Sequence, residues 1–167
     1  MTANLVALGY RVRAIVRNTS TATALFGSLP PGAQLEFVNA DLRDAEALEG
    51  SGVCSGVDAV VCCTGTTAFP SSRWKGGNNP VATDALGVAN LVAAVKAGSP
   101  SARFILCSSV GVLRTGAPPY SILNLFGVLT AKAAGEAALR ASGLPYLVLR
   151  PARLTECVVL RQPGTRT

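Results

Sequence analysis

The sequence contains no histidine, and charged residues make up only 14% of its 167 residues. Its five cysteines form no C-x-x-C pair, so no metal site is expected. Three of them, Cys62, Cys63 and Cys107, lie in apolar strand-like runs, where cysteine behaves as a small hydrophobic residue in a reducing compartment. No apolar run approaches the ~20 residues of a membrane span, and no secretory leader is found, so we expect a soluble protein.

Clusters of basic residues and aromatic residues are also scarce. The net charge of +6 comes from 15 Lys and Arg residues against 9 Asp and Glu residues, and aromatic residues make up 5% of the chain. Because the basic residues are spread along the chain, the composition disfavours nucleic acid as the main partner. RNA binding on the basic surface stays as the weaker alternative.

Acidic residues are absent from the first 35 positions, a composition that is typical of transit peptides. The same stretch nevertheless alternates basic and apolar residues in RVRAIV (11–16), as a strand does, and then turns at RNTS (17–20). We therefore interpret it as the end of a helix over 2–8 followed by a strand.

The sequence does contain a regular alternation of short apolar runs and longer helical patterns. We predict strands over 11–16, 34–40, 57–63, 102–109 and 145–150. We predict helices over 21–27, 44–50, 81–98 and 121–142, with a loop over 64–80. This order is typical of parallel strands joined by right-handed helical crossovers, so we expect an open α/β sheet with both faces covered.

Small or polar residues follow each predicted strand directly. The segments are RNTS (17–20), ADLRD (40–44), CTGTT (63–67), CSSVG (107–111) and RPARLT (150–155). In doubly wound sheets, ligands bind outside the carboxyl ends of the strands. The sequence therefore predicts a ligand site at this edge.

These segments, together with VDAVVCCTGTT (57–67) and AKAAGEAALRASGLPYLVLRPARLT (131–155), resemble the atypical short-chain dehydrogenase/reductase superfamily in its NAD(P)-binding, NmrA-like branch. The stretches TTAFPSSRWKGGNNP and PYSILNLFGVL are similar to plant and algal plastid members. The resemblance implies a Rossmann-like, doubly wound parallel sheet over residues 1–155, with an irregular tail over 156–167. It also implies a chloroplast location, the alternative being the cytoplasm.

The resemblance further implies a first strand and a G-x-x-G-x-x-G turn before Met1, and the sequence has neither. Those glycines would let the backbone hold the cofactor's pyrophosphate, and the strand would lie in the middle of the sheet. We therefore expect an incomplete, truncated domain in which the second and fourth family strands face a gap. We also expect a protein partner that completes the sheet.

Three cofactor contacts are implied beside the second and third family strands. Arg17 stands where an acidic residue would bind the ribose of NAD, and its guanidinium suits the 2′-phosphate of NADP. Asp41 is expected to accept a hydrogen bond from the adenine, with Leu42 against the ring. A helix N-cap is the equal alternative for Asp41, and Asp44 can serve the same role.

The resemblance also implies contacts after the fourth and fifth family strands. Cys63, Thr64 and Gly65 are expected where the backbone approaches the dinucleotide, and a side chain at Gly65 would block that approach. Ser108 and Ser109 match the strand end that carries the active-site serine in standard members. Packing at the end of a strand is the alternative for both serines.

Lys132 matches the lysine of the Tyr-x-x-x-Lys helix, which binds the nicotinamide ribose and lowers the tyrosine pKa. The tyrosine position is Val128, which cannot transfer a proton. Tyr120 lies twelve residues before the lysine and is not expected to replace it. The alternative for Lys132 is an exposed helical lysine paired with Glu136 at i,i+4.

The sequence therefore predicts an NAD(P)-binding Rossmann-fold protein that resembles an NADP-dependent reductase with impaired catalysis. The alternative is a regulator or scaffold that senses NADP(H) without catalysis. Ser109 and Lys132 are the candidate catalytic residues. The substrate cannot be identified from the sequence.

Overall fold

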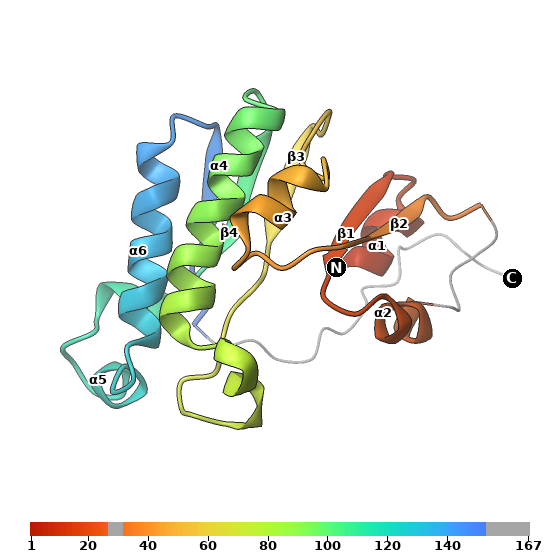
Figure 1. The fold of residues 1–167 in the computed structure, drawn as a ribbon. Helices are drawn as coiled ribbons and strands as arrows, with labels where there is room; N and C mark the ends of the chain where they lie inside the picture. Colours follow the sequence, from red (N-terminus) through yellow and green to blue (C-terminus); the bar gives the residue numbers. More distant parts are fainter. Residues whose placement is uncertain (27–31, 153–167) are drawn as a thin grey trace, which may run out of the picture.

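The computed structural model describes residues 1–26 and 32–152. Their elements form an α/β fold in which every strand pair is parallel (Figure 1). The strands are β1 (Val12–Val16), β2 (Leu35–Asn39), β3 (Ala59–Cys62), β4 (Arg103–Cys107) and β5 (Tyr146–Leu149). The α-helices are α1 (Thr2–Ala7), α2 (Thr19–Phe26), α3 (Ala45–Gly50), α4 (Val88–Gly98), α5 (Tyr120–Leu123) and α6 (Val128–Ala141). Short helical segments of other types are η1 (Ser72–Gly77), η2 (Val81–Gly87) and η3 (Val110–Leu113).

The strands form two sheets in the described part of the chain. One sheet pairs β1 with β2, with Val12 opposite Leu35, and the other has the order β3-β4-β5. The expectation that a strand is missing between β1 and β3 stays a prediction. Arg13 on β1 reaches across, because its guanidinium donates to the Ser55 carbonyl at 2.6 Å.

The core lies between the three-stranded sheet and helices α3, α4 and α6, which cover one of its faces (Figure 1). Val95, Phe104 and Leu139 are completely buried there. The opposite face is open, because Leu147 and Leu149 on β5 are 47% and 48% exposed. The expectation that both faces are covered is therefore wrong for this sheet in the part of the chain that the structure describes.

The predicted helix over 121–142 is also wrong as one continuous element. The chain forms α5, turns through Gly127 at a φ of 77°, and begins again as α6. The side-chain oxygen of Asn124 accepts hydrogen bonds from the Leu129 and Thr130 amides at 2.8 and 3.1 Å. Because this side chain satisfies amides at the start of α6, the helix begins there rather than at residue 121.

The other predicted helices and the loop over 64–80 are close to the observed elements. The helix over 81–98 begins with a π-helical turn, η2, before it continues as α4. The loop contains the short η1 turn. The combined stretch Ser72–Gly98 is long enough to span a membrane, and an 18-residue window within it is apolar enough, with a mean hydropathy of 1.3. That is weak evidence for a span, since η1 is interrupted at Lys75 and Gly76 and α4 packs into the core.

Candidate functional site

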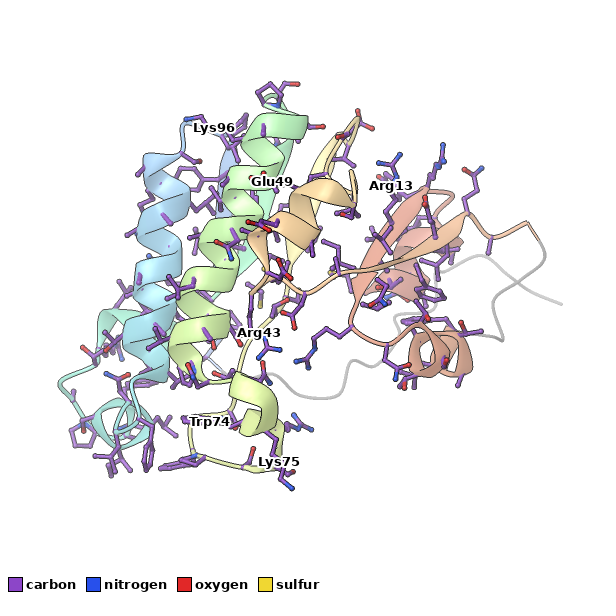
Figure 2. The ribbon with its side chains drawn as sticks, in the orientation of Figure 1. Arg13, Arg43, Glu49, Trp74, Lys75 and Lys96 are labelled. Atoms are coloured by element: carbon purple, nitrogen blue, oxygen red, sulfur yellow. The ribbon has the colours of Figure 1, made fainter. Side chains whose placement is uncertain are left out.

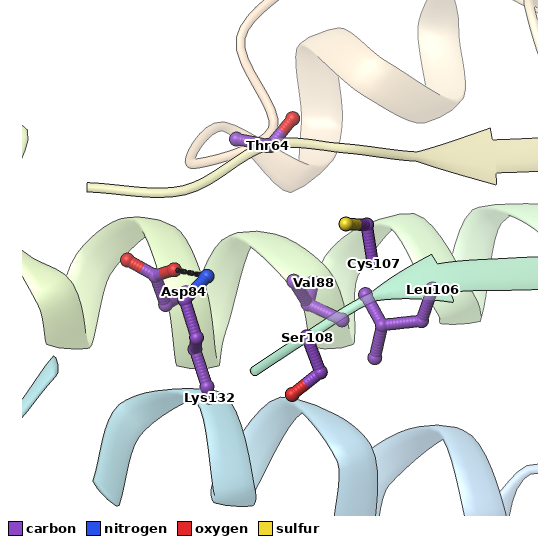
Figure 3. Close-up of a pocket in the computed structure, with 7 residues that line it drawn as sticks. All are labelled: Thr64, Asp84, Val88, Leu106, Cys107, Ser108 and Lys132. Atoms are coloured by element: carbon purple, nitrogen blue, oxygen red, sulfur yellow. Dashed lines mark hydrogen bonds and ion pairs between the residues drawn. The ribbon is translucent and has the colours of Figure 1, made fainter. Parts of the chain in front are cut away.

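Lys132 on α6 is held at the carboxyl edge of the three-stranded sheet by a buried carboxylate. Its ammonium lies 2.6 Å from Asp84 Oδ1, and the Asp84 side chain is completely buried (Figure 3). Thr66 donates to the other carboxylate oxygen through its amide at 3.0 Å and its hydroxyl at 2.5 Å. Three segments far apart in the sequence therefore meet at one ion pair.

Gly65 lies directly against this pair. A Cβ atom at Gly65 would come within 2.7 Å of Lys132 Nζ and 3.1 Å of Asp84 Oδ1. A larger residue there would have to displace the lysine or its partner. In this structure the group that lies against Gly65 is the lysine ammonium, and the approach of Gly65 to the dinucleotide stays a prediction.

Glu136, one turn after Lys132, belongs to a different cluster. Its carboxylate accepts from Arg140 Nη2 at 2.6 Å and from Arg150 Nε and Nη2 at 2.9 and 2.5 Å. Burial alone would raise the pKa of Glu136, but the guanidinium of Arg150, the nearby Ser108 hydroxyl and Arg140 lower it to about 2. The alternative that paired Lys132 with Glu136 is therefore wrong, because two arginines saturate that carboxylate.

The two candidate serines after β4 differ in their environment. Ser109 caps η3, since its hydroxyl accepts from the Gly111 amide at 3.2 Å. Ser108 is buried, and its Oγ has no hydrogen-bond partner of proper geometry in the described residues, although it lies near Glu136. Ser108 is thus the serine with an unsatisfied polar atom at the strand end.

A small hollow joins several of these groups. It is lined by Thr64, Asp84, Val88, Leu106, Cys107, Ser108 and Lys132 (Figure 3). Its volume is about 10 Å³, which is roughly the space that one water molecule needs. The hollow marks where polar groups converge at the sheet edge, and it is too small to enclose a nicotinamide ring.

The residues that are predicted to contact the adenosine end of the cofactor follow the carboxyl ends of β1 and β2. Arg17 is exposed. Asp41 accepts from Arg43 at 3.0, 3.1 and 2.6 Å, and this hydrogen bonding lowers the pKa of Asp41, as does the charge of Arg17. Leu42 is buried in the core.

The N-cap alternative for Asp41 is wrong, because the cap of α3 is Asp44. Its Oδ1 accepts from the Ala47 amide at 3.0 Å. Arg43, which is labelled in Figure 2, instead ties Asp41 to the 64–80 loop, because it also donates a 2.7 Å hydrogen bond to the Gly76 carbonyl. The adenine contacts of Asp41 and Leu42 stay predictions.

The proton-donor position carries a buried apolar residue. Val128 is the first residue of α6 and is 4% exposed. The ring of Tyr120 packs at Gly111, where an added Cβ would meet it at 2.7 Å. No described contact joins Tyr120 to Lys132.

The fold thus gathers Thr64, Gly65, Ser108 and Lys132 around one point, and places Cys63 on an exposed strand end beside them. Sequence reasoning missed Asp84. The available signal was a single acidic residue inside the otherwise apolar pattern VATDALGVANLVAAV. An acid on the buried side of a helix needs a partner, and Lys132 supplies it.

These groups suit the ribose and nicotinamide end of a dinucleotide. The lysine ammonium has three donors, and among the described residues it donates one hydrogen bond, to Asp84. The other donors of the ammonium can bind ribose oxygens, whereas the Ser108 hydroxyl is buried beside a hollow with room for about one water molecule. In the part of the chain that the structure describes, no cluster of three His, Cys, Asp or Glu residues could hold a metal.

Comparison with curated proteins finds relatives that are named as chloroplastic proteins. The chain is 37% identical over 160 residues to Protein TIC 62, chloroplastic, of Pisum sativum, covering 88% of this chain and 29% of that protein. It is 32% identical over 160 residues to the uncharacterized protein At2g34460, chloroplastic, of Arabidopsis thaliana, covering 90% of this chain and 52% of that protein. The chain thus spans about half, or less, of the length of these relatives.

Two solved structures share the fold. Yeast methylglyoxal/isovaleraldehyde reductase Gre2, complexed with NADPH, has a TM-score of 0.66 at 14% identity, over 89% of this chain and 52% of its own. The Bordetella bronchiseptica enzyme WbmH, in complex with NAD+, has a TM-score of 0.64 at 23% identity, over 89% of this chain and 49% of its own. The family described as NAD(P)H-binding matches residues 1–162. The chain therefore belongs to the NAD(P)H-binding family with a Rossmann-like fold, and its resemblance to NmrA-like atypical short-chain dehydrogenase/reductases is confirmed.

Proposed function

We propose that this chain binds NADP(H) and does not use it for tyrosine-dependent carbonyl reduction. The proposal rests on the surroundings of Lys132. Asp84 holds the Lys132 ammonium against Gly65, and a buried valine, Val128, occupies the proton-donor position. Lys132 holds the nicotinamide ribose, and Ser108 lies at the same end of the cofactor, behind the lysine. The cofactor would supply hydride chemistry when bound, but this chain offers no tyrosine there to move the proton.

Preference for NADP over NAD rests on the charges beside β1 and β2. Arg43 already neutralises Asp41, as the hydrogen bonds and the lowered pKa of Asp41 indicate. The exposed Arg17 guanidinium is therefore available as a planar set of donors for a 2′-phosphate. An acidic residue at position 17 would repel the same phosphate.

The test compares NADPH and NADH binding by isothermal titration calorimetry. Arg17→Ala should weaken NADPH binding by about 10- to 100-fold, because a hydrogen bond to a charged group contributes about 1.5–3 kcal/mol. NADH binding should change by less than about threefold. Arg11→Ala is the matched control, since Arg11 is also exposed and stands before the same strand. Equal weakening of both cofactors, or an equal effect of Arg11→Ala, would contradict NADP selection by Arg17.

The proposed lack of carbonyl reduction is tested separately, with the wild-type chain and NADPH. We expect NADPH to bind, and no oxidation of NADPH above the background rate with a panel of aldehydes and ketones. Sustained turnover that Lys132→Gln abolishes would favour the reductase alternative. Lys96→Gln is the matched control, because Lys96 is an exposed lysine in the last turn of α4, far from the site (Figure 2).

We further propose a chloroplast location, since the TIC 62 and At2g34460 relatives are named chloroplastic. Fluorescent fusions of the complete gene product, imaged against chlorophyll fluorescence, test this. Exclusive cytoplasmic signal would contradict it.

A further inference from the structure

Two cysteines lie side by side at the carboxyl ends of β3 and β4. The parallel register pairs Cys62 with Leu106, so the next residues along the two strands are Cys63 and Cys107. Neighbouring strands lie about 4.8 Å apart, which is within the Cα separation that a disulfide bridges. Cys63 follows the last residue of β3 directly and Cys107 is the last residue of β4, so continuation of the register brings the two residues within bridging distance.

Both side chains lie on the open face of the sheet. Cys62 and Leu106 are 2% and 4% exposed and belong to the core beneath the helices. Because successive residues of a strand point to opposite faces, Cys63 and Cys107 share the other face. Cys63 is exposed and Cys107 is partly exposed, so an oxidant in solution can reach them.

The surroundings of Cys63 agree with this placement. Partial burial raises the pKa of the Cys63 thiol, and the neighbouring Cys107 and Cys62 thiols raise it further, as expected for sulfur atoms close together. Figure 3 shows the Cys107 side chain extending toward the segment of Thr64, the residue that follows Cys63. The remaining described cysteines, Cys54 and Cys62, are buried.

We propose that Cys63 and Cys107 form a reversible intramolecular disulfide, with a small disulfide such as oxidised glutathione as the oxidant. The Cys63 thiolate attacks one glutathione sulfur, forming a mixed disulfide and releasing one glutathione thiolate. The Cys107 thiolate then attacks the Cys63 sulfur and releases the second glutathione. The two cysteines lose two protons and two electrons, and these convert one oxidised glutathione into two reduced ones. The proposal does not depend on cofactor binding.

The experiment measures the intact mass after incubation with oxidised glutathione, in a Cys157→Ser background that removes the cysteine outside the described residues. We expect a product two hydrogens lighter than the reduced chain, with no retained glutathione, that dithiothreitol converts back. Tandem mass spectrometry should find the peptide over 44–73 joined to that over 104–114 through Cys63 and Cys107. Retained glutathione, a cross-link through Cys54 or Cys62, or thiols left unmodified would each overturn the proposal.

Serine variants locate the reacting pair. Cys62→Ser is the matched control next to Cys63, and it should still form the disulfide to within about twofold of the background chain. Cys63→Ser and Cys107→Ser should each lower the yield of disulfide at least tenfold, and Cys107→Ser should retain one glutathione on Cys63. Each variant is first checked for a cooperative thermal transition. Closure in a folded Cys63→Ser or Cys107→Ser variant would overturn the assignment.

Discussion

The region before residue 41 and the region after it are packed very differently. Residues 1–40 contribute only Val6, Ala22 and Ala40 to the described buried hydrophobic residues. All the others belong to β3, β4 and the helices around them, or to the segments that join these elements. The first region nevertheless carries Arg17, whereas the second carries Lys132.

This difference indicates that the two regions proposed to bind the two ends of the cofactor differ in stability. The β1–β2 sheet buries little apolar surface, so local opening there should cost less free energy than opening of the β3-β4-β5 sheet. A ligand that binds both regions would then stabilise the first region most. The predictions below test that contrast.

The largest contrast is expected from matched phenylalanine substitutions in the two sheets. Phe104→Ala in β4 removes a completely buried ring and should lower the free energy of unfolding by about 3–5 kcal/mol. Phe37→Ala in β2 removes a partly exposed ring that packs on Phe26, and should cost at least about 1 kcal/mol less. Urea unfolding at pH 7 measures both. Equal losses would contradict the unequal packing.

Acid should lower the stability of the region after residue 41, because it protonates Glu136. The pKa of Glu136 is about 2 in the folded chain and 4.5 in its ordinary state. Because the pKa of Glu136 is lowered in the folded chain, its ionised carboxylate stabilises the fold at pH values above about 4.5. This contribution is lost as the pH falls from about 4.5 through about 2. The loss is up to about 3 kcal/mol. Thermal unfolding across this range measures it.

Glu136→Gln and Glu36→Gln form the matched pair for that experiment. Glu136→Gln should flatten the dependence of stability on pH in this range. Glu36 makes an exposed ion pair with Arg13 at 3.5 Å, and such pairs contribute little, so Glu36→Gln should leave the pH dependence nearly unchanged. A pH dependence that is identical in wild type and Glu136→Gln would exclude Glu136 as its source.

The smallest expected effect is on hydrogen exchange with NADPH bound. At a free NADPH concentration ten times its Kd, exchange from β1 and β2 amides should slow by about tenfold, which corresponds to about 1.4 kcal/mol. Amides of β4 should change less, because the core already protects them. Exchange followed by mass spectrometry measures both strands. Protection confined to β4 would contradict a cofactor that stabilises the first region.

The alternation of apolar runs was sufficient to predict the five strands to within two residues at each end, since each strand is a short apolar segment with its own flanking turn. Local signals failed where a long-range or side-chain contact decided the outcome. The Asn124 side chain accepts from amides in the first turn of α6, so this helix begins at Val128 and not at residue 121. The expected cover on both faces of the sheet is missing at Leu147 and Leu149, which are exposed on the open face.

The candidate site was predicted in part for the same reason. The strand-end rule and the family resemblance pointed to Thr64, Ser108 and Lys132, which line one hollow, and to Gly65, which lies against Lys132. The partner of Lys132 could not be predicted from spacing, because Asp84 lies 48 residues away. Glu136 has the right helical spacing, but Arg150 on a different element occupies it.

The sequence by itself determined the α/β class, the NAD(P)H-binding family and the absence of a tyrosine four residues before Lys132, because these depend on local pattern and residue identity. The tertiary structure alone decided which charges pair. Asp84 takes Lys132 and Glu136 takes two arginines, since a buried carboxylate must be neutralised by whichever cation the packing of helices brings within reach. The tertiary structure likewise decided that Cys63 and Cys107 are neighbours, because the pairing of β3 with β4 brings together residues 44 positions apart.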